Sequence, residues 1–281
     1  MDGSAANIRS TMVSIIMNCY NCSRYLKEAI DSVYVQTYGD WEIIFWDNVS
    51  TDNSAEIAKS YNSKLLYFRG DTNVPLGNAR NLAIEKANGR YIAFLDCDDI
   101  WLPSKLEKQV SLFEANPDVK LVFSDSNVVN SKRERMYNSF SVQQPFRGHV
   151  FNDLLLSYNF IPLVTAVIER SVLEDVGMFD NRYKIAEEYD FFLRIAHEYP
   201  LDYVDETLAE YRVHDSNWSH KQDICIREEL EIINKWVNQD FSIKHDIGHK
   251  VMIRKMKRHA ALYLFYAVKY LHLPKSFAKF Y

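Results

Sequence analysis

The stretch YIAFLDCDDIWLP (residues 91–103) decides the fold of this chain. Its first five residues are aromatic, aliphatic or β-branched, which is typical of a buried strand. Asp96, Asp98 and Asp99 follow at once, and unpaired carboxylates are costly to bury, so we expect them at the exposed end of that strand. Clustered carboxylate oxygens suit Mg²⁺ or Mn²⁺, which link carboxylates to substrate phosphates. The alternative is that Asp98 and Asp99 only cap the helix announced by Pro103.

The composition describes an ordered globular protein. The chain has 281 residues, of which 47% are hydrophobic and 14% aromatic, enough for one large core or a main domain with an appendage. We find no repeat, no signal peptide and no apolar run that could span a bilayer. Residues 1–10 are small and polar and are expected to form a disordered lead. Nucleic acid is not expected as a partner, and oligomerisation is left open.

The charge is distributed unevenly. The net charge is −5, yet residues 250–281 contain eight basic side chains and no acidic one, which leaves −13 on the rest. Over 250–271 the apolar residues fall on one helical face, so this helix either packs on the rest of the chain or lies on an anionic membrane surface, and the two are compatible. The apolar face consists of Ile253, Met256, Ala260, Leu264, Ala267 and Leu271, with aromatic bulk from Tyr263, Phe265, Tyr266, Tyr270, Phe277, Phe280 and Tyr281.

The four cysteines are too few for a disulfide framework. Cys19 and Cys22 have the spacing of a redox pair. Without a second cysteine pair or a nearby histidine, the sequence does not support a zinc site. We interpret them as ordinary reduced thiols, which predicts a cytoplasmic protein.

Strands and helices alternate along the first half of the chain, which predicts an α/β fold with a mostly parallel sheet and helices on both faces. No GxGxxG motif follows the first strand and no GxxxxGK[ST] motif is present, which argues against a dehydrogenase or an ATPase. Residues 125–160 are polar and then aromatic, and we expect a mobile loop there. The expected strands are 12–17, 41–46, 64–68, 91–95, 121–124 and 164–168, and the expected helices are 23–36, one from 52, 77–87, 104–114, 152–157, 171–176 and 187–197.

In such sheets ligands bind outside the carboxyl ends of the strands. Polar residues follow three predicted strands, at 18–21, 47–48 and 96–99, and together they predict one polar mouth. In the last predicted helix Asp190 and Arg194 are four residues apart and should pair, whereas Glu187 and Glu188 have no such local partner.

Read together, these residues resemble the family-2 glycosyltransferases of the GT-A fold, which transfer a sugar from a nucleotide diphosphate to an acceptor hydroxyl. The resemblance runs from about residue 13 to residue 214, roughly three quarters of the chain. Its landmarks, in the family's order, are VSIIMNCYN (13–21), WDNVSTD (46–52), GNARN (77–81), GRYIAFLDCDD (89–99), EEYD (187–190) and YRVH (211–214).

The resemblance implies roles for individual residues. Asn18, Tyr20, Asp47 and Asn48 would hold the nucleobase and ribose. Arg80 would lie near the diphosphate, where its forked guanidinium suits phosphate oxygens. Asp96 would face the ribose or the donor sugar. Asp98 would be the metal ligand of the family's DxD element, and His214 would lie near the diphosphate or the metal.

Two positions depart from the family's pattern. Asn48 stands where an aspartate is usual; it can accept a base N–H but brings no charge. Glu188 stands where the family has the aspartate that acts as general base, and it keeps the carboxylate with one more methylene. Such a base takes the proton of the acceptor hydroxyl as that oxygen attacks opposite the diphosphate, which inverts the anomeric carbon.

The sequence therefore predicts an inverting, Mn²⁺- or Mg²⁺-dependent glycosyltransferase with a nucleotide-sugar donor, most simply a UDP-sugar. Its acceptor would be a saccharide or a lipid-linked saccharide, met in the cytoplasm or at the inner face of the membrane. Two alternatives stay open, a nucleotidyltransferase and a sugar-nucleotide-binding protein without turnover. The predicted domain boundaries are 11–218 for a GT-A domain, divided at 125/126 into nucleotide- and acceptor-binding halves, and 219–281 for a basic, aromatic helical extension.

Overall fold

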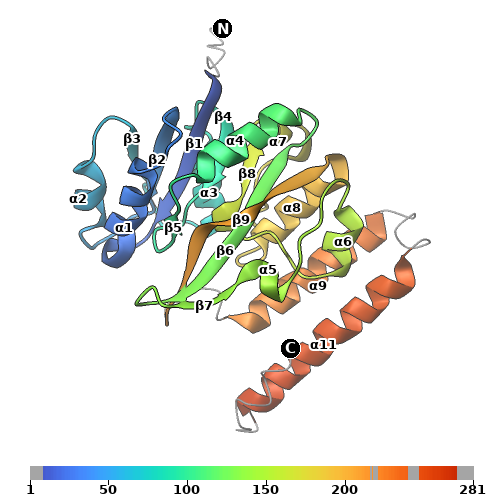
Figure 1. Cartoon of the computed structure of the whole chain (residues 1–281). Helices are drawn as coiled ribbons and strands as arrows, with labels where there is room; N and C mark the ends of the chain where they lie inside the picture. Colours follow the sequence, from blue (N-terminus) through green and yellow to red (C-terminus); the bar gives the residue numbers. More distant parts are fainter. Residues whose placement is uncertain (1–8, 216, 218–220, 240–246, 271–281) are drawn as a thin grey trace, which may run out of the picture.

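A nine-stranded mixed sheet forms the centre of the protein in the computed structural model, which describes residues 9–215, 217, 221–239 and 247–270 (Figure 1). The strand order is β3-β2-β1-β4-β8-β6-β9-β5, and β7 pairs with β6 at the side of this path. The strands are β1 (Arg9–Cys19), β2 (Trp41–Asp47), β3 (Leu65–Arg69), β4 (Gly89–Phe94), β5 (Ile100–Trp101), β6 (Leu121–Asn130), β7 (Arg135–Asn138), β8 (Val167–Glu169) and β9 (Leu201–Val213).

Strands β3, β2, β1 and β4 are parallel neighbours, as the alternation of strands and helices predicts. Side chains alternate between two hydrophobic cores, because successive residues of a strand face opposite sides of the sheet. In β4, Tyr91 and Ala93 enter one core, and Ile92 and Phe94 enter the other. Residues 9 and 10 already belong to β1, so the expected disordered lead is too long by two residues; residues 1–8 lie outside the described part.

The expectation of a loop after residue 124 is wrong. Strand β6 continues to Asn130 and turns into β7, and along its whole length it pairs in parallel with β9, a long strand that the sequence did not reveal. Asp125, a polar residue at the centre of β6, finds hydrogen-bond partners in β7 and α5. Asp125 accepts bonds from the backbone N–H of Phe140 at 3.0 Å and from Asn138 at 3.1 Å. Buried polar groups that are paired in this way are compatible with a strand.

Helices cover both faces of the sheet. One core packs α1, α2 and α4 against the sheet, and the other packs α3, α6, α7 and α8. The helices of the main body are α1 (Ser23–Tyr34), α2 (Ser54–Lys59), α3 (Leu76–Ile84), α4 (Lys105–Ala115), α5 (Ser139–Val142), α6 (Phe151–Leu156), α7 (Val172–Val176) and α8 (Glu187–Glu198), with a short 3₁₀ turn η1 at Leu163–Thr165.

Two C-terminal helices, α9 (Gln222–Gln239) and α11 (Gly248–Tyr270), lie along the α6–α8 side of the molecule (Figure 1). Ile232 and Ile233 of α9 and Val251 of α11 are part of the same core as α8. The 219–281 segment is therefore helical in its described parts and packs on the main body. Among the described residues, no helix combines the length and apolar character needed to cross a lipid bilayer.

The side of α11 that packs inward differs from the simplest expectation. Arg254 is buried, and its Nη1 donates to the carbonyl oxygen of Leu154 at 3.1 Å, while Arg258 pairs with Glu229 of α9. The apolar side chains of Ile253 and Met256 are exposed instead. Of the other expected apolar positions, the side chains of Leu264 and Ala267 and all of residue 271 lie outside the described residues, as do the aromatic side chains from 263 on.

Candidate functional site

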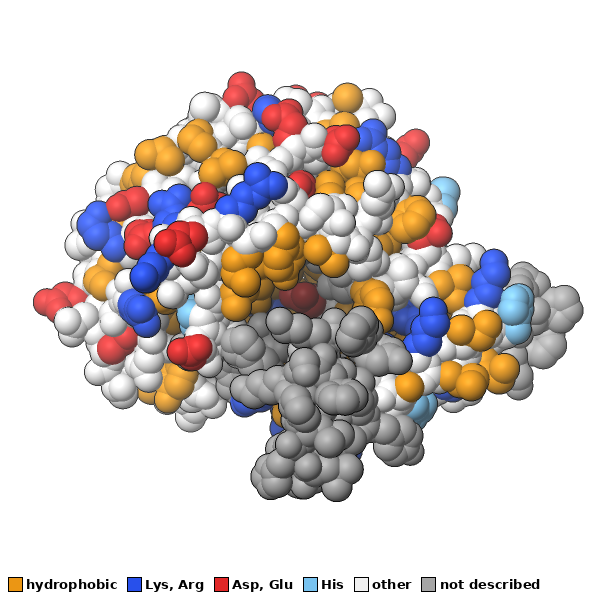
Figure 2. All heavy atoms as spheres, turned by 60° about the horizontal axis from the view of Figure 1, so that its bottom comes forward, with side chains coloured by type: hydrophobic (Ala, Val, Ile, Leu, Met, Phe, Trp, Pro, Cys, Tyr) orange, Lys and Arg blue, Asp and Glu red, His pale blue; other side chains and the backbone are white. Residues whose placement is uncertain are grey.

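The carboxyl ends of β1, β2 and β4 meet at one edge of the sheet. Cys19 at the end of β1 is in register with Asp47 at the end of β2, and Ile16 of β1 is in register with Phe94 at the end of β4. The three predicted polar segments therefore converge, because parallel strands end on the same side. On the face at the bottom of Figure 1, Figure 2 shows a hollow with an acidic floor between hydrophobic patches.

Asp98 contacts the end of β9 at this edge. The Nε2 atom of His214 lies 2.9 Å from Oδ2 of Asp98, and the His214 ring stacks on Tyr25 with ring centroids 5.2 Å apart. Burial, and then the negative charge of Asp96, raise the pKa of Asp98. The structure thus brings together the two residues that the resemblance assigns to the metal.

Asp99 has a structural role that the sequence did not indicate. Its side chain is buried, and its Oδ1 accepts the backbone N–H of Arg212 at 2.8 Å. The Nε of Arg212 donates to the carbonyl oxygen of Asp98 at 2.8 Å, so the end of β9 is tied to the carboxylate segment twice. The alternative of helix capping is wrong, because α4 begins after Ser104, far from both carboxylates.

Arg80 of α3 links two acidic residues from different elements. Its Nη1 donates to Oε1 of Glu187 at 2.6 Å, and its Nη2 lies 3.2 Å from Oδ1 of Asp96. Arg80 and Glu187 are almost fully buried, whereas the Asp96 side chain is 38% exposed. Burial removes water from the guanidinium group, so its remaining N–H donors need acceptors within the protein, and Asp96 supplies one. Arg80 therefore couples the end of β4 to the first turn of α8.

Glu188, the next residue of α8, has no ion-pair partner among the residues that the structure describes. It is half-buried, and its Oε1 accepts a hydrogen bond of 3.3 Å from Nδ2 of Asn159. Burial, followed by the negative charge of Glu187, raises the pKa of Glu188 to about 8. A carboxyl group with such a pKa can take up a proton near neutral pH. Asn159 was missed from the sequence, since nothing local connects it with a residue 29 positions away.

Asp47 and Asn48 are occupied by contacts within the protein. Asp47 is fully buried and accepts bonds from the hydroxyl of Tyr67 at 2.6 Å and the backbone N–H of Ser50 at 2.7 Å, and it pairs with Arg69. Burial alone would raise its pKa, but these partners hold the pKa below the usual value.

The Asn48 amide donates to the carbonyl oxygen of Val74 at 2.8 Å, and its Oδ1 accepts the N–H of the same residue at 3.1 Å. Asn48 thus holds the loop before α3 against the end of β2, and Asp47 ties the turn after β2 to β3. Together the two residues shape the rim of the site.

Asn18 and Tyr20 lie beside this rim. Tyr20 is 55% exposed and offers a ring surface to the solvent. The Nδ2 atom of Asn18 is buried and has no hydrogen-bond acceptor among the described residues. A buried donor without a partner costs free energy, which a bound ligand can recover by accepting the bond.

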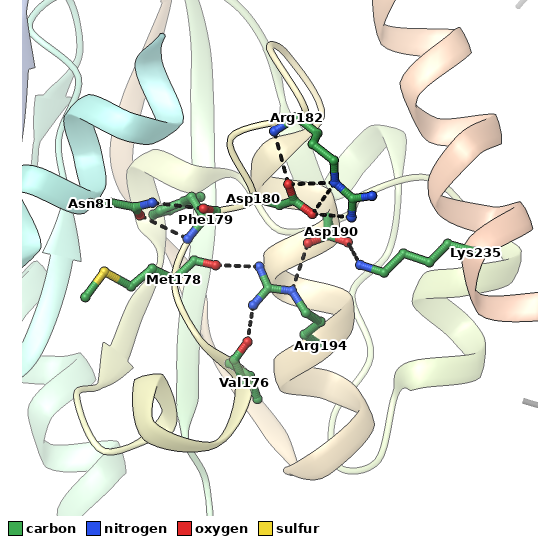
Figure 3. Close-up of polar contacts among 9 residues, drawn as sticks. All are labelled: Asn81, Val176, Met178, Phe179, Asp180, Arg182, Asp190, Arg194 and Lys235. Atoms are coloured by element: carbon green, nitrogen blue, oxygen red, sulfur yellow. Dashed lines mark hydrogen bonds and ion pairs between the residues drawn. The ribbon is translucent and has the colours of Figure 1, made fainter. Parts of the chain in front are cut away.

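A polar network braces the first turn of α8 (Figure 3). Asp190 is fully buried and binds two cations, Nε of Arg194 at 2.8 Å and Nζ of Lys235 of α9 at 2.9 Å. Arg194 also donates to the carbonyl oxygens of Val176 and Met178, the latter at 2.8 Å. The predicted Asp190–Arg194 pair is confirmed, and it fixes the turn that precedes α8.

Glu228 of α9 holds the residues directly before Glu187 and Glu188. Its carboxylate accepts three backbone N–H groups, from Lys184 and Ile185 at 2.9 Å and from Ala186 at 3.0 Å. Hydrogen bonds to a charged acceptor are about twice as strong as neutral ones. The C-terminal extension therefore takes part in positioning α8.

We expect Glu228→Gln to lower the free energy of unfolding by about 1–3 kcal/mol, because one amide oxygen replaces two carboxylate oxygens. Denaturant unfolding measures the change. Glu231→Gln is the matched control, since Glu231 is an exposed residue of the same helix and should change stability little. Equal stability of both variants and the parent would contradict this role of Glu228.

The donor atoms at this edge fit a divalent cation. Asp98 and His214 present an oxygen and a nitrogen atom 2.9 Å apart, and both side chains are only partly buried. Carboxylates suit Mg²⁺ and Mn²⁺, and an imidazole ligand favours a transition metal over Mg²⁺.

Comparison with known proteins agrees with this geometry. The model of the family described as "Glycosyl transferase family 2" matches residues 14–177. An uncharacterized glycosyltransferase of Methanocaldococcus jannaschii, MJ1057, is 32% identical over 215 residues, covering 72% of this chain and 71% of its own. The Escherichia coli protein WfgD, named as a UDP-Glc:α-D-GlcNAc-diphosphoundecaprenol β-1,3-glucosyltransferase, is 27% identical over 252 residues, covering 89% and 95%.

Solved structures share the fold. TarS residues 1–349 of S. aureus in complex with UDP-GlcNAc superposes with a TM-score of 0.64 and 16% identity, over 88% of this chain and 79% of that one. The mannosyltransferase PcManGT of Pyrobaculum calidifontis, in complex with GDP-Man and Mn²⁺, gives 0.61 and 16%, over 94% and 81%. The fold is thus of the GT-A type. The match to a glycosyltransferase family argues against the alternative of a nucleotidyltransferase. By its sequence, this chain belongs to glycosyltransferase family 2.

Proposed function

We propose that this protein is an inverting, metal-dependent glycosyltransferase that moves a sugar from a UDP-sugar to a saccharide hydroxyl in polysaccharide or glycoconjugate synthesis. The observation that carries the proposal is the convergence of Asp96, Arg80 and Glu187 beside Glu188, a carboxyl group with a pKa of about 8 and with no ion-pair partner in the described part of the chain. A proton acceptor thereby lies next to the carboxylates of the donor site.

In this mechanism Glu188 is the general base. A carboxylate oxygen of Glu188 takes the proton of the acceptor hydroxyl as the hydroxyl oxygen attacks the anomeric carbon. The bond from that carbon to the diphosphate oxygen breaks on the opposite face, which inverts the configuration. Asn159 orients the carboxylate through its hydrogen bond, and the neighbouring Glu187 raises the affinity of Glu188 for a proton.

The remaining site residues bind the donor. Asn18 and Tyr20, with the rim formed by Asp47 and Asn48, hold the nucleoside. Asp96 faces the ribose or sugar, and Arg80 balances the carboxylates around it near the diphosphate. Asp98 and His214 would hold Mn²⁺ or Mg²⁺, which would supply positive charge to stabilise the leaving diphosphate.

The comparisons support a uridine nucleotide as donor and a lipid-linked acceptor. TarS was solved with UDP-GlcNAc, and the name of WfgD specifies UDP-Glc and a diphosphoundecaprenol-linked acceptor. The structure of PcManGT contains Mn²⁺ and GDP-Man, so it supports Mn²⁺ as the metal but does not support uridine as the nucleoside of the donor. A lipid-linked acceptor would place the protein in the cytoplasm, at the inner face of the membrane.

The test is to add UDP-, GDP- and dTDP-sugars to the protein with Mn²⁺. For each sugar nucleotide, the melting temperature of the protein and the release of nucleoside diphosphate are measured. A UDP-sugar should raise the melting temperature and be turned over when a saccharide or lipid-linked acceptor is added. The second candidate is binding without turnover, which the longer side chain of Glu188 favours. Stabilisation by a donor with neither transfer nor hydrolysis, across the acceptors tried, would identify that alternative.

We also propose that α11 contacts an anionic membrane surface. Met252, Ile253 and Met256 are 57%, 48% and 64% exposed, and Lys255 and Lys257 lie among them. Figure 2 shows hydrophobic and basic side chains next to one another on this helix, at the right of the view. Apolar side chains at the headgroup level with lysines on anionic lipid are typical of a helix lying in a membrane interface.

We expect Met256→Glu to reduce binding to anionic vesicles at low salt, because it adds a negative charge and removes apolar area from this face. Removing α11 altogether would be a poorer test, since Val251 and Arg254 pack into the body. Val35→Glu is the matched control, as Val35 is 59% exposed at the end of α1. Co-sedimentation measures the difference, and equal recovery of the parent with anionic and neutral vesicles would rule out the contact.

A further inference from the structure

Three of the four cysteines meet at the base of the site. Cys19 ends β1, Cys22 directly precedes α1, and Cys97 follows β4 between Asp96 and Asp98. Their sulfur atoms all lie within 4.8 Å of one another. The sequence shows only the first pair; the third sulfur arrives because β1 and β4 are adjacent parallel strands.

The cluster is held by the backbone around it. The Cys97 thiol donates to the carbonyl oxygen of Asn18 at 3.2 Å, and Cys22 Sγ accepts the backbone N–H of Tyr20 at 3.3 Å. Cys19 and Cys97 are buried, whereas Cys22 is half-buried.

We propose that Cys19, Cys22 and Cys97 form a binding site for a thiophilic cation such as Zn²⁺. Zn–S bonds of about 2.3 Å place three sulfurs roughly 4 Å apart around one ion, so the sulfurs need to approach by less than about 1 Å. A fourth position remains for water. Each thiol that becomes a ligand releases its proton to solvent.

This site differs chemically from the one at Asp98 and His214. Sulfur ligands select Zn²⁺ or Cu⁺, whereas carboxylate ligands suit Mg²⁺ and Mn²⁺. The two sites are nevertheless mechanically linked, because Cys97 separates Asp96 from Asp98 and Cys19 follows Asn18. A cation bound to the three thiols would fix the backbone at the ends of β1 and β4. The same two strand ends provide residues of the proposed donor site.

The experiment is a titration of the reduced, metal-free full chain with Cd²⁺ and Zn²⁺. Cd²⁺ should bind with one equivalent and produce ultraviolet thiolate-to-metal charge-transfer absorption. In protein loaded first with Zn²⁺, this absorption should grow only as Cd²⁺ replaces the Zn²⁺, because thiolates prefer the softer cation. Loss of an outer-shell partner alone costs about 10–100-fold in affinity, so Cys19→Ser, Cys22→Ser and Cys97→Ser should each weaken binding at least about 10-fold. Cys225→Ser is the matched control, because Cys225 lies in α9 beside Glu229 and should leave the affinity unchanged.

Four results would overturn the proposal. The first is binding of Cd²⁺ to the three serine variants as tightly as to the parent, and the second is no binding of Cd²⁺ to the parent. Binding that survives Cys22→Ser but is lost in Asp98→Asn would place the ion in the donor site. A disulfide between two of the three cysteines that persists in isolated protein supplied with Zn²⁺ would identify a redox pair instead. None of these readouts depends on glycosyl transfer.

Discussion

Replacing Glu188 by glutamine is expected to lower kcat by roughly 10²–10⁴-fold, the usual contribution of a general base. The amide keeps the size of the side chain and the position of Asn159 but cannot take up a proton. Donor binding should change little, because the hydrogen bonds that Arg80 makes to Glu187 and Asp96 do not involve the Glu188 side chain. Nucleoside diphosphate release measures kcat, and donor-induced thermal shift measures binding.

Glu187→Gln separates the two neighbouring glutamates. Glu187 pairs with the buried Arg80, so its loss should lower the melting temperature and weaken donor binding. A mild effect of Glu188→Gln together with a severe loss of kcat in a well-folded Glu187→Gln would assign the base to Glu187. If neither change affects kcat, an inverting mechanism of this kind is wrong.

The pH dependence follows from the raised pKa of Glu188. The base works in its ionised form, so kcat should rise with pH and level off above about 8, the pKa that burial and the charge of Glu187 produce. Glu187→Gln removes that charge, lowers the pKa of Glu188 and should move the rising limb to lower pH. A profile of kcat against pH that is flat between 6 and 9 would contradict this assignment.

Replacing Asp98 by asparagine is expected to reduce turnover by on the order of 10²-fold or more while the fold survives. The change removes the charged oxygen of the Asp98–His214 pair, and with it electrostatic stabilisation of the leaving diphosphate. EDTA should abolish both transfer and metal-dependent stabilisation by the nucleotide.

Asp118→Asn is the matched control, since Asp118 is an exposed aspartate after α4. It should retain full turnover and full response to Mn²⁺. Circular dichroism and thermal unfolding test whether Asp98→Asn is folded. Undiminished transfer in EDTA by the parent protein would rule out a metal requirement.

Local patterns in the sequence were sufficient for the first half of the fold. The apolar runs that become β1, β2 and β4 and the spacing of α1 and α8 follow from periodicities of two and 3.6 residues, which depend on near neighbours only. The meeting of Asn18, Asp47 and Asp96 at one edge followed from the rule that parallel strands end on the same side.

Contacts between distant residues needed the tertiary structure. From the sequence, the polar centre of β6 is predicted to be a loop. Its burial depends on β9, about 80 residues later, and on hydrogen bonds such as the one that Asn138 donates to Asp125. Arg80 and Glu187 are 107 positions apart, and the residues next to either of them in the sequence give no sign that the two pair.

The sequence by itself thus determined the parallel half of the sheet, the carboxylate-rich strand end and the family, since these are properties of continuous segments. The tertiary structure alone decided which glutamate is paired, which face of α11 is turned outward, and that Cys97 joins Cys19 and Cys22. The apolar pattern of α11 marks a hydrophobic face without specifying what covers it, and here two arginines with carbonyl and carboxylate partners occupy the packed side. Burial of a charge depends on partners that only the folded chain supplies.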